Sequence, residues 1–538
     1  MHQSWLASSA LLLLVASTLA GAATSIDAIT INRITDAAFN HGEVLDTAEY
    51  LADQIGGRLT NSPSMRAAER WTQEKFKAWG LKDVRAEGYD FGRGWWIESS
   101  QARMLAPRPL MLRAIPIAWT PSTEGPLSAA VIVAPMTGEK DFADWKGKLS
   151  GKIVLVTWPA PIKDDEDAPF HRLSDTEIAK LDHYAEPVFD PEARQKLIDR
   201  VAFRDKRDAF LAAEGALAWI QMSRTEGRLL HGEGYNFQVG RTPKLPALEI
   251  GAEDYRRLAR LAKLGEVRVE IDSRVHYEDA DHNAYNILAD IPGTDGKAGY
   301  VMAGAHLDSW VAGDGAADNG AGVAVVMEAA RILASLHVQP KRTILFALWS
   351  GEEQGLWGSA AYVEKHLAHR PPNADPAVAA LGPYYGGDTY PVQTLPGFAE
   401  LSAYFNIDNG SGRIRGIFTE GNFAVVPIFR QWLAPFASMG AAAVVAAPTG
   451  STDHVFLSQL GLPAFQFIQD PLDYMSRVHH TDLDTFDHVR PEDLRQAAAV
   501  LATVLLDAAD SDAPLPRKPV PSQPRLTDPF HYPDPAKR

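Results

Sequence analysis

Apolar residues in the second half of this chain form short continuous runs that alternate with stretches of helix-type spacing. Continuous runs are typical of strands buried on both faces, and apolar residues that recur every three or four positions are typical of helices packed on them. Strands are expected at residues 300–305, 343–349, 401–407 and 463–467, and helices at 320–336 and 491–508. This alternation predicts an α/β fold with helices on both faces of a sheet.

The first half of the chain has a different pattern. Residues 41–83 are expected to be helical, with one helix at 64–79 that Gly80 ends. The middle of the next segment, residues 159–199, is polar and rich in Asp and Pro, which predicts a long surface loop. Around it we expect strands at 130–133, 152–156 and 216–221 and a helix at 204–214.

The chain has 538 residues, which is more than one ordinary domain contains. The changes in pattern predict an interrupted main domain. The expected divisions are a signal peptide at 1–22, the first part of the main domain at 23–120, an insert at 121–285, the rest of the main domain at 286–510 and a Pro-rich tail at 511–538.

The N-terminus has the features of an export signal. Residues 5–19 are mostly apolar, and Ala20-Gly21-Ala22 follows as a small-x-small cleavage sequence. The apolar run is short for a bilayer span, which needs about 20 residues. We therefore expect cleavage after Ala22, a mature chain without an integral membrane span, and a secreted or bacterial periplasmic protein.

Charge and cysteine content exclude several functions. The formal net charge is −16, which disfavours nucleic-acid binding because phosphate contacts need a basic surface. The sequence contains no cysteine, so disulfides, thiolate zinc sites, iron–sulfur clusters and a cysteine nucleophile are excluded. Any metal must be bound by His, Asp and Glu.

Such residues follow the expected strands. His306 and Asp308 come after the first strand, Glu352 and Glu353 after the second, and Asp408 after the third. In an open α/β sheet, ligands bind beyond the carboxyl ends of the strands. Imidazoles and carboxylates are the zinc ligands that remain when thiolates are absent. Of two adjacent glutamates, one can bind metal while the other acts as a general base.

Two further segments supply the same residue types. Asp318 lies in a Gly-rich loop before the helix at 320, from which its carboxylate could bridge two ions. Near the C-terminus, His480 offers another imidazole, and Asp484 is close enough in sequence to support it.

These motifs resemble those of the co-catalytic zinc aminopeptidases and carboxypeptidases, a family that includes bacterial leucyl aminopeptidases, plasma glutamate carboxypeptidase and glutamate carboxypeptidase II. The resemblance covers about residues 40–100 and 286–508. It implies a three-layer α/β zinc-peptidase fold with a central mixed, mostly parallel sheet. The matching motifs are His306-Leu307-Asp308-Ser309-Trp310, Asp318 in its Gly-rich loop, Glu352-Glu353-Gln354-Gly355, Asp408 and His480-Thr481-x-x-Asp484-Thr485.

The resemblance also implies the roles of single residues. His306 and Asp408 would bind one zinc ion, Glu353 and His480 would bind the other, and Asp318 would bridge the two. Glu352 would be the general base, and Asp308 would orient His306. Cobalt or manganese would fit the same ligands.

The segment 121–285 resembles a β-rich protease-associated domain inserted into the peptidase domain. Relatives with this insert form homodimers, so a homodimer is one expectation. For contact with substrate or a developing oxyanion, the sequence offers His479, Tyr474 and Asp453. His479 could instead be the metal ligand in place of His480.

The leading prediction is a secreted dizinc exopeptidase that acts on peptides, with an aminopeptidase as the first choice. A carboxypeptidase or dipeptidase on the same scaffold is the alternative, since linear sequence does not place the charge that reads a substrate terminus. A zinc acyltransferase of the glutaminyl-cyclase kind and a non-catalytic receptor-like protein are more remote alternatives. The insert argues against the first, and the complete set of ligand residues argues against the second.

Overall fold

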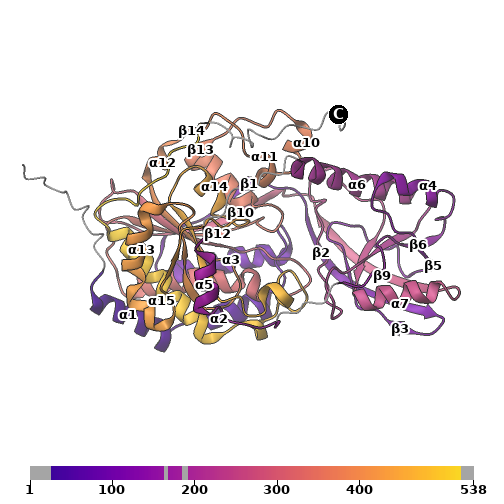
Figure 1. The fold of residues 1–538 in the computed structure, drawn as a ribbon, viewed down its shortest axis with the longest axis horizontal. Helices are drawn as coiled ribbons and strands as arrows, with labels where there is room; N and C mark the ends of the chain where they lie inside the picture. The colour runs from indigo at the N-terminus through magenta and orange to yellow at the C-terminus, as the bar shows by residue number, and fades with distance from the viewer. Residues whose placement is uncertain (1–25, 163–167, 184–191, 523–538) are drawn as a thin grey trace, which may run out of the picture.

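The computed structural model describes residues 26–162, 168–183 and 192–522, and it contains two eight-stranded sheets (Figure 1). The expected signal peptide and residues 523–538 of the expected tail lie outside the described residues. None of the helices in the described residues is both long and apolar enough to cross a membrane.

The first sheet carries the strands that were expected after residue 286. Its spatial order is β1-β10-β12-β11-β15-β18-β16-β17, and it is mixed, with β12, β11, β15 and β18 parallel to one another. The strands are β1 (Lys82–Asp90), β10 (Asn283–Ile291), β11 (Tyr300–His306), β12 (Thr343–Trp349), β15 (Leu401–Asn406), β16 (Ile414–Phe418), β17 (Ala443–Val445) and β18 (Ala464–Gln469).

Helices cover both faces of this sheet, which confirms the three-layer prediction. Alternate residues of β11 point to opposite cores: Val301 packs in one cluster and Met302 in the other. α8 and α15 are buried around most of their circumference, as expected for apolar helices inside a large domain. The helices of one face are α1 (Ala28–Asn40), α2 (Val44–Glu49), α3 (Pro63–Ala78), α8 (Ala321–Ser335), α13 (Val426–Leu433) and α15 (Pro491–Asp510), and those of the other are α9 (Trp357–Tyr362), α12 (Pro396–Glu400) and α14 (Val455–Gln459). We call the first sheet with these helices the first-sheet region.

The second sheet lies to one side of the first-sheet region (Figure 1) and has the order β3-β2-β9-β5-β6-β7-β8-β4. Its strands begin at Gly94, earlier than the insert boundary expected at residue 121, because β2 pairs along its length with β9. We call residues 94–278 the second-sheet region, although one of its helices, α5 (Asp175–Leu181), lies over the first-sheet region (Figure 1), where Asp182 accepts from the backbone N–H of Ala446. Its elements are β2 (Gly94–Ala106), β3 (Leu110–Met111), β4 (Ala114–Pro116), β5 (Leu127–Val133), α4 (Phe142–Trp145), β6 (Lys152–Leu155), α5 (Asp175–Leu181), α6 (Ala193–Ala213), β7 (Ala218–Met222), β8 (Ala247–Ile250), α7 (Ala252–Ala262) and β9 (Arg268–Glu278).

The prediction of a long loop at 159–199 is wrong in part, because α5 and the beginning of α6 lie within it. Ser174 starts α5 with a capping box, in which its hydroxyl accepts from the backbone N–H of Glu177 and the Glu177 carboxylate accepts from the backbone N–H of Ser174. The serine and glutamate three residues apart were the signal for this helix.

A small excursion follows α9 and forms one wall of the cleft described below. It contains a two-stranded ribbon of β13 (Ala368–His369) with β14 (Gln393–Thr394), and the short helices α10 (Pro376–Ala379) and α11 (Pro383–Gly386). α10 contacts α6 of the second-sheet region, so the two regions meet on this side of the molecule.

Candidate metal centre

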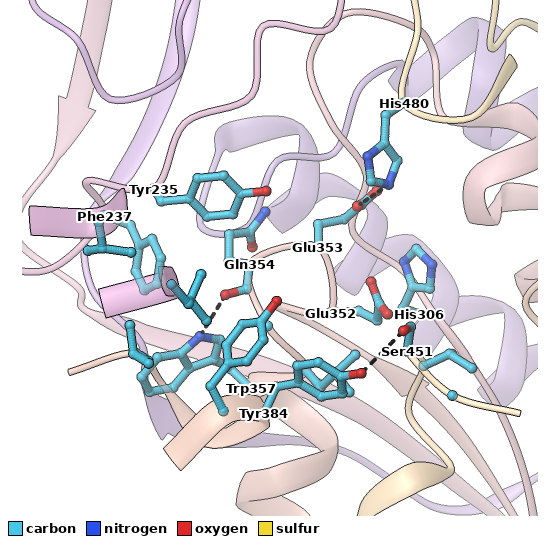
Figure 2. A pocket seen from close by; sticks show the side chains of 18 of the residues that line it. Tyr235, Phe237, His306, Glu352, Glu353, Gln354, Trp357, Tyr384, Ser451 and His480 are labelled. Carbon is cyan, nitrogen blue, oxygen red and sulfur yellow. Dashed lines mark hydrogen bonds and ion pairs between the residues drawn. The ribbon is translucent and has the colours of Figure 1, made fainter. Parts of the chain in front are cut away.

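Three neighbouring parallel strands bring their carboxyl ends together. His306 is the last residue of β11 and lies opposite Trp349, the last residue of β12. On the other side of β11, β15 ends at Asn406, two residues before Asp408. Figure 2 shows His306, Glu352 and Glu353 meeting in one pocket. The grouping predicted from the strand ends is therefore present in the fold.

Asp318 lies between two histidines. Its Oδ1 is 3.4 Å from Nε2 of His306, and its Oδ2 is 3.4 Å from Nε2 of His480. His306 Nε2 is also 3.3 Å from Asp408 Oδ1, and His480 Nε2 is 3.0 Å from Glu353 Oε2. Two clusters of an imidazole and carboxylates therefore share one aspartate.

These separations fit zinc. Ligand atoms at about 2.0–2.2 Å from a tetrahedral zinc ion lie about 3.3–3.6 Å from one another. His306, Asp318 and Asp408 can present one ligand atom each to a common ion, and so can Asp318, His479 and His480. In the second group the choice that the sequence left open remains, because His479 Nε2 is 3.8 Å from Asp318 Oδ2 and its ring stacks on His480 at 3.8 Å.

The electrostatics of the cluster also suit cations. Asp318 Oδ2 and Glu353 Oε1 are buried without a hydrogen-bond partner. Burial raises the pKa of Glu353 to about 7 and that of Glu352 well above its ordinary value. Burial lowers the pKa of His306, but the charges of Asp408 and Glu352 outweigh it and raise that pKa well above the usual range. A divalent cation would relieve this crowding of buried negative charge.

The loop that carries Asp318 is fixed by groups outside the cluster. The buried guanidinium of Arg58 donates to the backbone carbonyls of Leu307, Asp314 and Gly315 at 2.7–2.8 Å. Gly315 has a left-handed φ of 64°, and a Cβ there would lie 2.4 Å from a side-chain atom of the adjoining loop. This loop therefore needs glycine at that position.

Asp484 holds the same loop from the C-terminal side. Its carboxylate accepts from the backbone N–H groups of Ala317 and Asp318 at 2.6 and 3.1 Å. It therefore supports the metal-facing aspartate through the backbone, outside the group of candidate ligands.

Asp308 lies beside His306, but its carboxylate does not hold the ring. Nδ1 of His306 is 2.9 Å from the backbone carbonyl of Asp308, whereas the Asp308 carboxylate oxygen is 3.8 Å away. That carboxylate accepts instead from the backbone N–H groups of Glu352 and Glu353 at 3.2 and 3.3 Å. The side chain thus fixes the glutamate pair, and the main chain fixes the histidine.

A cleft of about 530 Å³ opens over these residues and is lined by both regions. Aromatic rings make up much of its wall, with Tyr235 and Phe237 from the second-sheet region facing Trp357 and Tyr384 from the first-sheet region (Figure 2). The Tyr384 hydroxyl is 3.2 Å from Ser451 Oγ across the mouth. Arg200 and Arg204 of α6 also line the cleft.

The three residues that the sequence offered for contact with substrate have different positions. Tyr474 and His479 line the cleft, and their rings meet edge to face at 5.0 Å. Asp453 is completely buried and is not part of the lining. It accepts a hydrogen bond from the Ser359 hydroxyl, and burial raises its pKa to about 7.

Sequence reasoning missed the residues that the second-sheet region contributes. Glu233 approaches His480 from the loop between β7 and β8, and its Oε1 is 2.8 Å from Nδ1 of that ring. No strand end, repeat or metal-ligand spacing distinguishes Glu233, Tyr235 or Phe237 in the sequence. Only the docking of the two regions brings them to the cleft.

Comparison with known proteins relates the chain to peptidases. Residues 286–505 match the model of peptidase family M28. Carboxypeptidase Q of Bos taurus is 28% identical over 474 residues, which are 87% of this chain and 85% of that protein. Carboxypeptidase Q of Homo sapiens is 25% identical over a region of the same extent.

Solved structures agree with this relationship. A peptidase M28 precursor from Shewanella amazonensis has a TM-score of 0.64 at 25% identity, and the match covers 92% of this chain and 99% of that one. A zinc aminopeptidase from Bacillus subtilis shares the fold with a TM-score of 0.54 at 18% identity, covering 88% of this chain and 98% of that one.

Proposed function

We propose that this chain, whose residues 286–505 belong to peptidase family M28, is a dizinc aminopeptidase that acts on short peptides. Family membership makes the chain a metallo-exopeptidase. The number of metal ions, the residue roles and the substrate terminus are the substance of the proposal.

The position of Asp318 is the observation that carries it. One oxygen of this carboxylate faces His306, and the other faces His480, both at 3.4 Å. A single zinc ion would need only one of these oxygens, whereas a bridged pair of ions uses both. We assign His306, Asp318 and Asp408 to one zinc ion, and Asp318, Glu353 and His480 to the other.

Zinc bound here supplies Lewis-acid polarisation of the scissile carbonyl and acidifies water. Glu352 is the general base: its carboxylate takes the proton of the attacking water and delivers it to the nitrogen of the leaving amine. Burial raises the pKa of Glu352, which suits a group that is first a base and then an acid. Asp308 holds this glutamate by accepting from its backbone N–H.

The charges of the cleft support recognition of a free amine beside the scissile bond. In an aminopeptidase substrate, the amine is one residue from the carbonyl that is attacked. Glu352, which lines the cleft beside the proposed ligands and is not assigned to a metal ion, offers a carboxylate that suits an ammonium group. Both regions line the cleft, and its volume of about 530 Å³ suits short peptides.

A dipeptidase or carboxypeptidase activity is the second candidate, and a specific observation favours it. Arg200 and Arg204, both on α6, line the cleft on the side of the second-sheet region. A guanidinium is a suitable partner for the free carboxylate of a short substrate. Similarity to carboxypeptidase Q points the same way.

Two further assignments accompany this function. The apolar residues 5–19 and the small residues after them support export of the enzyme. Residues 94–278, with their separate sheet, correspond to the protease-associated insert that the sequence resembles, and they serve as the lid of the cleft.

The test is hydrolysis of a dipeptide panel with and without N-terminal acetylation, on enzyme whose zinc content is measured in the same sample. We expect free-amine peptides to be cut, acetylated peptides to resist, and two zinc ions per chain to be found. Removal of zinc with a chelator should abolish the activity, and added zinc should restore it.

Other outcomes have definite meanings. Release of a C-terminal residue from acetylated peptides would replace the aminopeptidase with a carboxypeptidase on the same site. Full activity with one zinc ion per chain would contradict the bridged pair. Absence of both zinc and hydrolysis would reject the proposed function.

A further inference from the structure

Glu233 links the second-sheet region to the candidate metal centre. It lies 247 residues before His480, in the loop between β7 and β8, and its side chain is 14% exposed. Its Oε1 accepts from Nδ1 of His480 at 2.8 Å. The other ring nitrogen, Nε2, faces Glu353 and Asp318 at 3.0 and 3.4 Å. In the His480 imidazole, Nδ1 therefore contacts the second-sheet region and Nε2 faces the first-sheet region.

Arg224 holds Glu233 from the opposite side. The two guanidinium nitrogens of this arginine donate to the two carboxylate oxygens of Glu233 at 2.8 and 2.6 Å. Such a bidentate pair fixes the plane of the carboxylate as well as its charge. Glu233 is thus presented to His480 in one orientation, from a loop anchored within its own region.

The consequence for His480 follows from imidazole chemistry. A neutral ring carries one proton, and a metal ion at Nε2 requires that proton to be on Nδ1. The stacked His479 ring and the edge of Trp310, with centroids at 3.8 and 6.1 Å, limit where the ring lies but not where its proton lies. Glu233 is the acceptor that Nδ1 finds among the described residues.

We propose that Glu233 is a positioning residue for the metal centre, through which the second-sheet region fixes His480 for metal binding. It keeps the proton on Nδ1 and makes Nε2 a stronger ligand. This inference rests on the proposed function, because it takes His480 as a zinc ligand. It adds that Nδ1 of His480 has this acceptor only while the second-sheet region is docked.

A second histidine–carboxylate pair offers a matched control. Within the second-sheet region, Nδ1 of His231 is 3.0 Å from Glu249 Oε1, and Glu249 is 3% exposed. This pair belongs to the same region and buries the same kinds of group, but it does not contact the metal centre. His231 lies on the same loop as Glu233, so loss of Glu249 reports what a disturbed loop does while the Glu233 carboxylate is still present.

The experiment measures zinc affinity by competition with a chromophoric chelator for the wild type, Glu233→Gln and Glu249→Gln. We expect Glu233→Gln to weaken one zinc site about 10–100-fold, the usual effect of losing such a partner of a ligand. Its kcat should fall with zinc occupancy and recover in excess zinc, while KM stays unchanged. Glu249→Gln should lower thermal stability and leave zinc affinity within about twofold.

Arg224→Gln keeps the test decisive if Glu233→Gln does not fold. It releases Glu233 from its clamp without removing the acceptor, so a smaller loss of zinc affinity is expected. If Glu233→Gln folds and keeps the wild-type zinc affinity, the inference is overturned and the proposed function is left intact. If only Arg224→Gln folds, wild-type zinc affinity in that variant has the same meaning. A wild-type chain that binds no zinc would overturn both.

Discussion

The two regions that meet at the cleft hold their acidic side chains differently. Glu233, from the second-sheet region, is clamped by Arg224 and His480; burial raises its pKa, but these partners outweigh that effect and hold it well below the ordinary value. Asp453, from the first-sheet region, accepts from the Ser359 hydroxyl, and burial raises its pKa to about 7. One region neutralises its carboxylate with an arginine, and the other does not.

This difference indicates which region suits metal binding and which suits substrate recognition. Carboxylates crowded at the strand ends of the first sheet are costly to bury unless a cation joins them, and divalent metal ions meet that need. The second-sheet region pairs Glu233 and Asp254 with arginines, and its Arg200 and Arg204 line the cleft. The second-sheet region therefore suits binding and recognition of a substrate, whereas the first-sheet region suits metal binding and catalysis.

Asp318→Ala should have the largest effect on the metal binding that we assign to the first-sheet region. Removal of the carboxylate that faces both histidines should lower the zinc content from two ions to one or none and reduce activity to the detection limit. Metal analysis and dipeptide hydrolysis measure both effects. Asp314→Ala, in the same loop but outside the ligand cluster, should keep its zinc. Retention of two ions by Asp318→Ala would remove the bridge from the mechanism.

Glu352→Gln separates chemistry from metal binding within the first-sheet region. The amide keeps the size of the side chain but cannot take a proton, so kcat should fall by about 10²–10⁴-fold, the usual contribution of a general base. Zinc content should stay at the wild-type level. A variant that loses zinc together with activity would show that Glu352 is a ligand and that the roles of the two glutamates need exchange.

Arg204→Gln tests whether the second-sheet region recognises the free carboxylate of a substrate. This exposed guanidinium lies 5.2 Å from the Tyr235 ring centroid at the cleft. We expect kcat/KM to fall about three- to tenfold for dipeptides with a free carboxylate, as for an exposed charge-assisted contact. Dipeptide amides should be unaffected. Arg194→Gln, also on α6 but outside the cleft lining, is the control; equal losses for acids and amides would contradict carboxylate recognition.

The last prediction concerns stability and not activity. Asp507 of α15 accepts from the backbone N–H of Ile26 at 2.7 Å, and burial raises its pKa to about 7. An acid whose pKa is raised by folding stabilises the fold below its unfolded pKa, and this contribution is lost as pH rises through the folded pKa. Asp507→Asn should therefore flatten the decline of the unfolding free energy between about pH 4 and pH 7, by up to about 4 kcal/mol.

Urea unfolding at several pH values measures this change, with Asp36→Asn on the exposed side of α1 as control. An unchanged pH dependence in Asp507→Asn would show that Asp507 titrates alike in the folded and unfolded chains.

Much of the first-sheet region could be predicted from the sequence, for a physical reason. Strands buried on both faces leave continuous apolar runs, so the ends of β11, β12 and β15 could be located and their polar residues grouped. The helix α15 was visible for the same reason, because nearly all of its residues are buried. His306, Glu353 and Asp408 were found because they follow such runs directly.

The strands β5, β6 and β7 and the end of α6 lie where the sequence predicted them, but the residues that the second-sheet region contributes to the cleft, and Arg58, could not be predicted in this way. β3 has two residues and β4 three, too few for a periodic pattern, and β2 finds β9 across a long stretch of chain. Glu233 and Arg58 act through tertiary contacts with residues more than 200 positions away. In the sequence, such charged residues cannot be distinguished from exposed surface residues, because their partners come close only in the folded chain.

The antiparallel pairing of β1 with β10 has a consequence for the order in which the protein forms. Asp90 lies opposite Asn283, so the chain leaves the first sheet and returns to it at one point. During synthesis, every strand of the second sheet has been made by residue 278, before synthesis of β11, β12, β15 and β18 begins. Domains fold as units in the order of their synthesis. Glu233 is thus made long before His480, and the candidate metal centre is among the last parts of the molecule to be assembled.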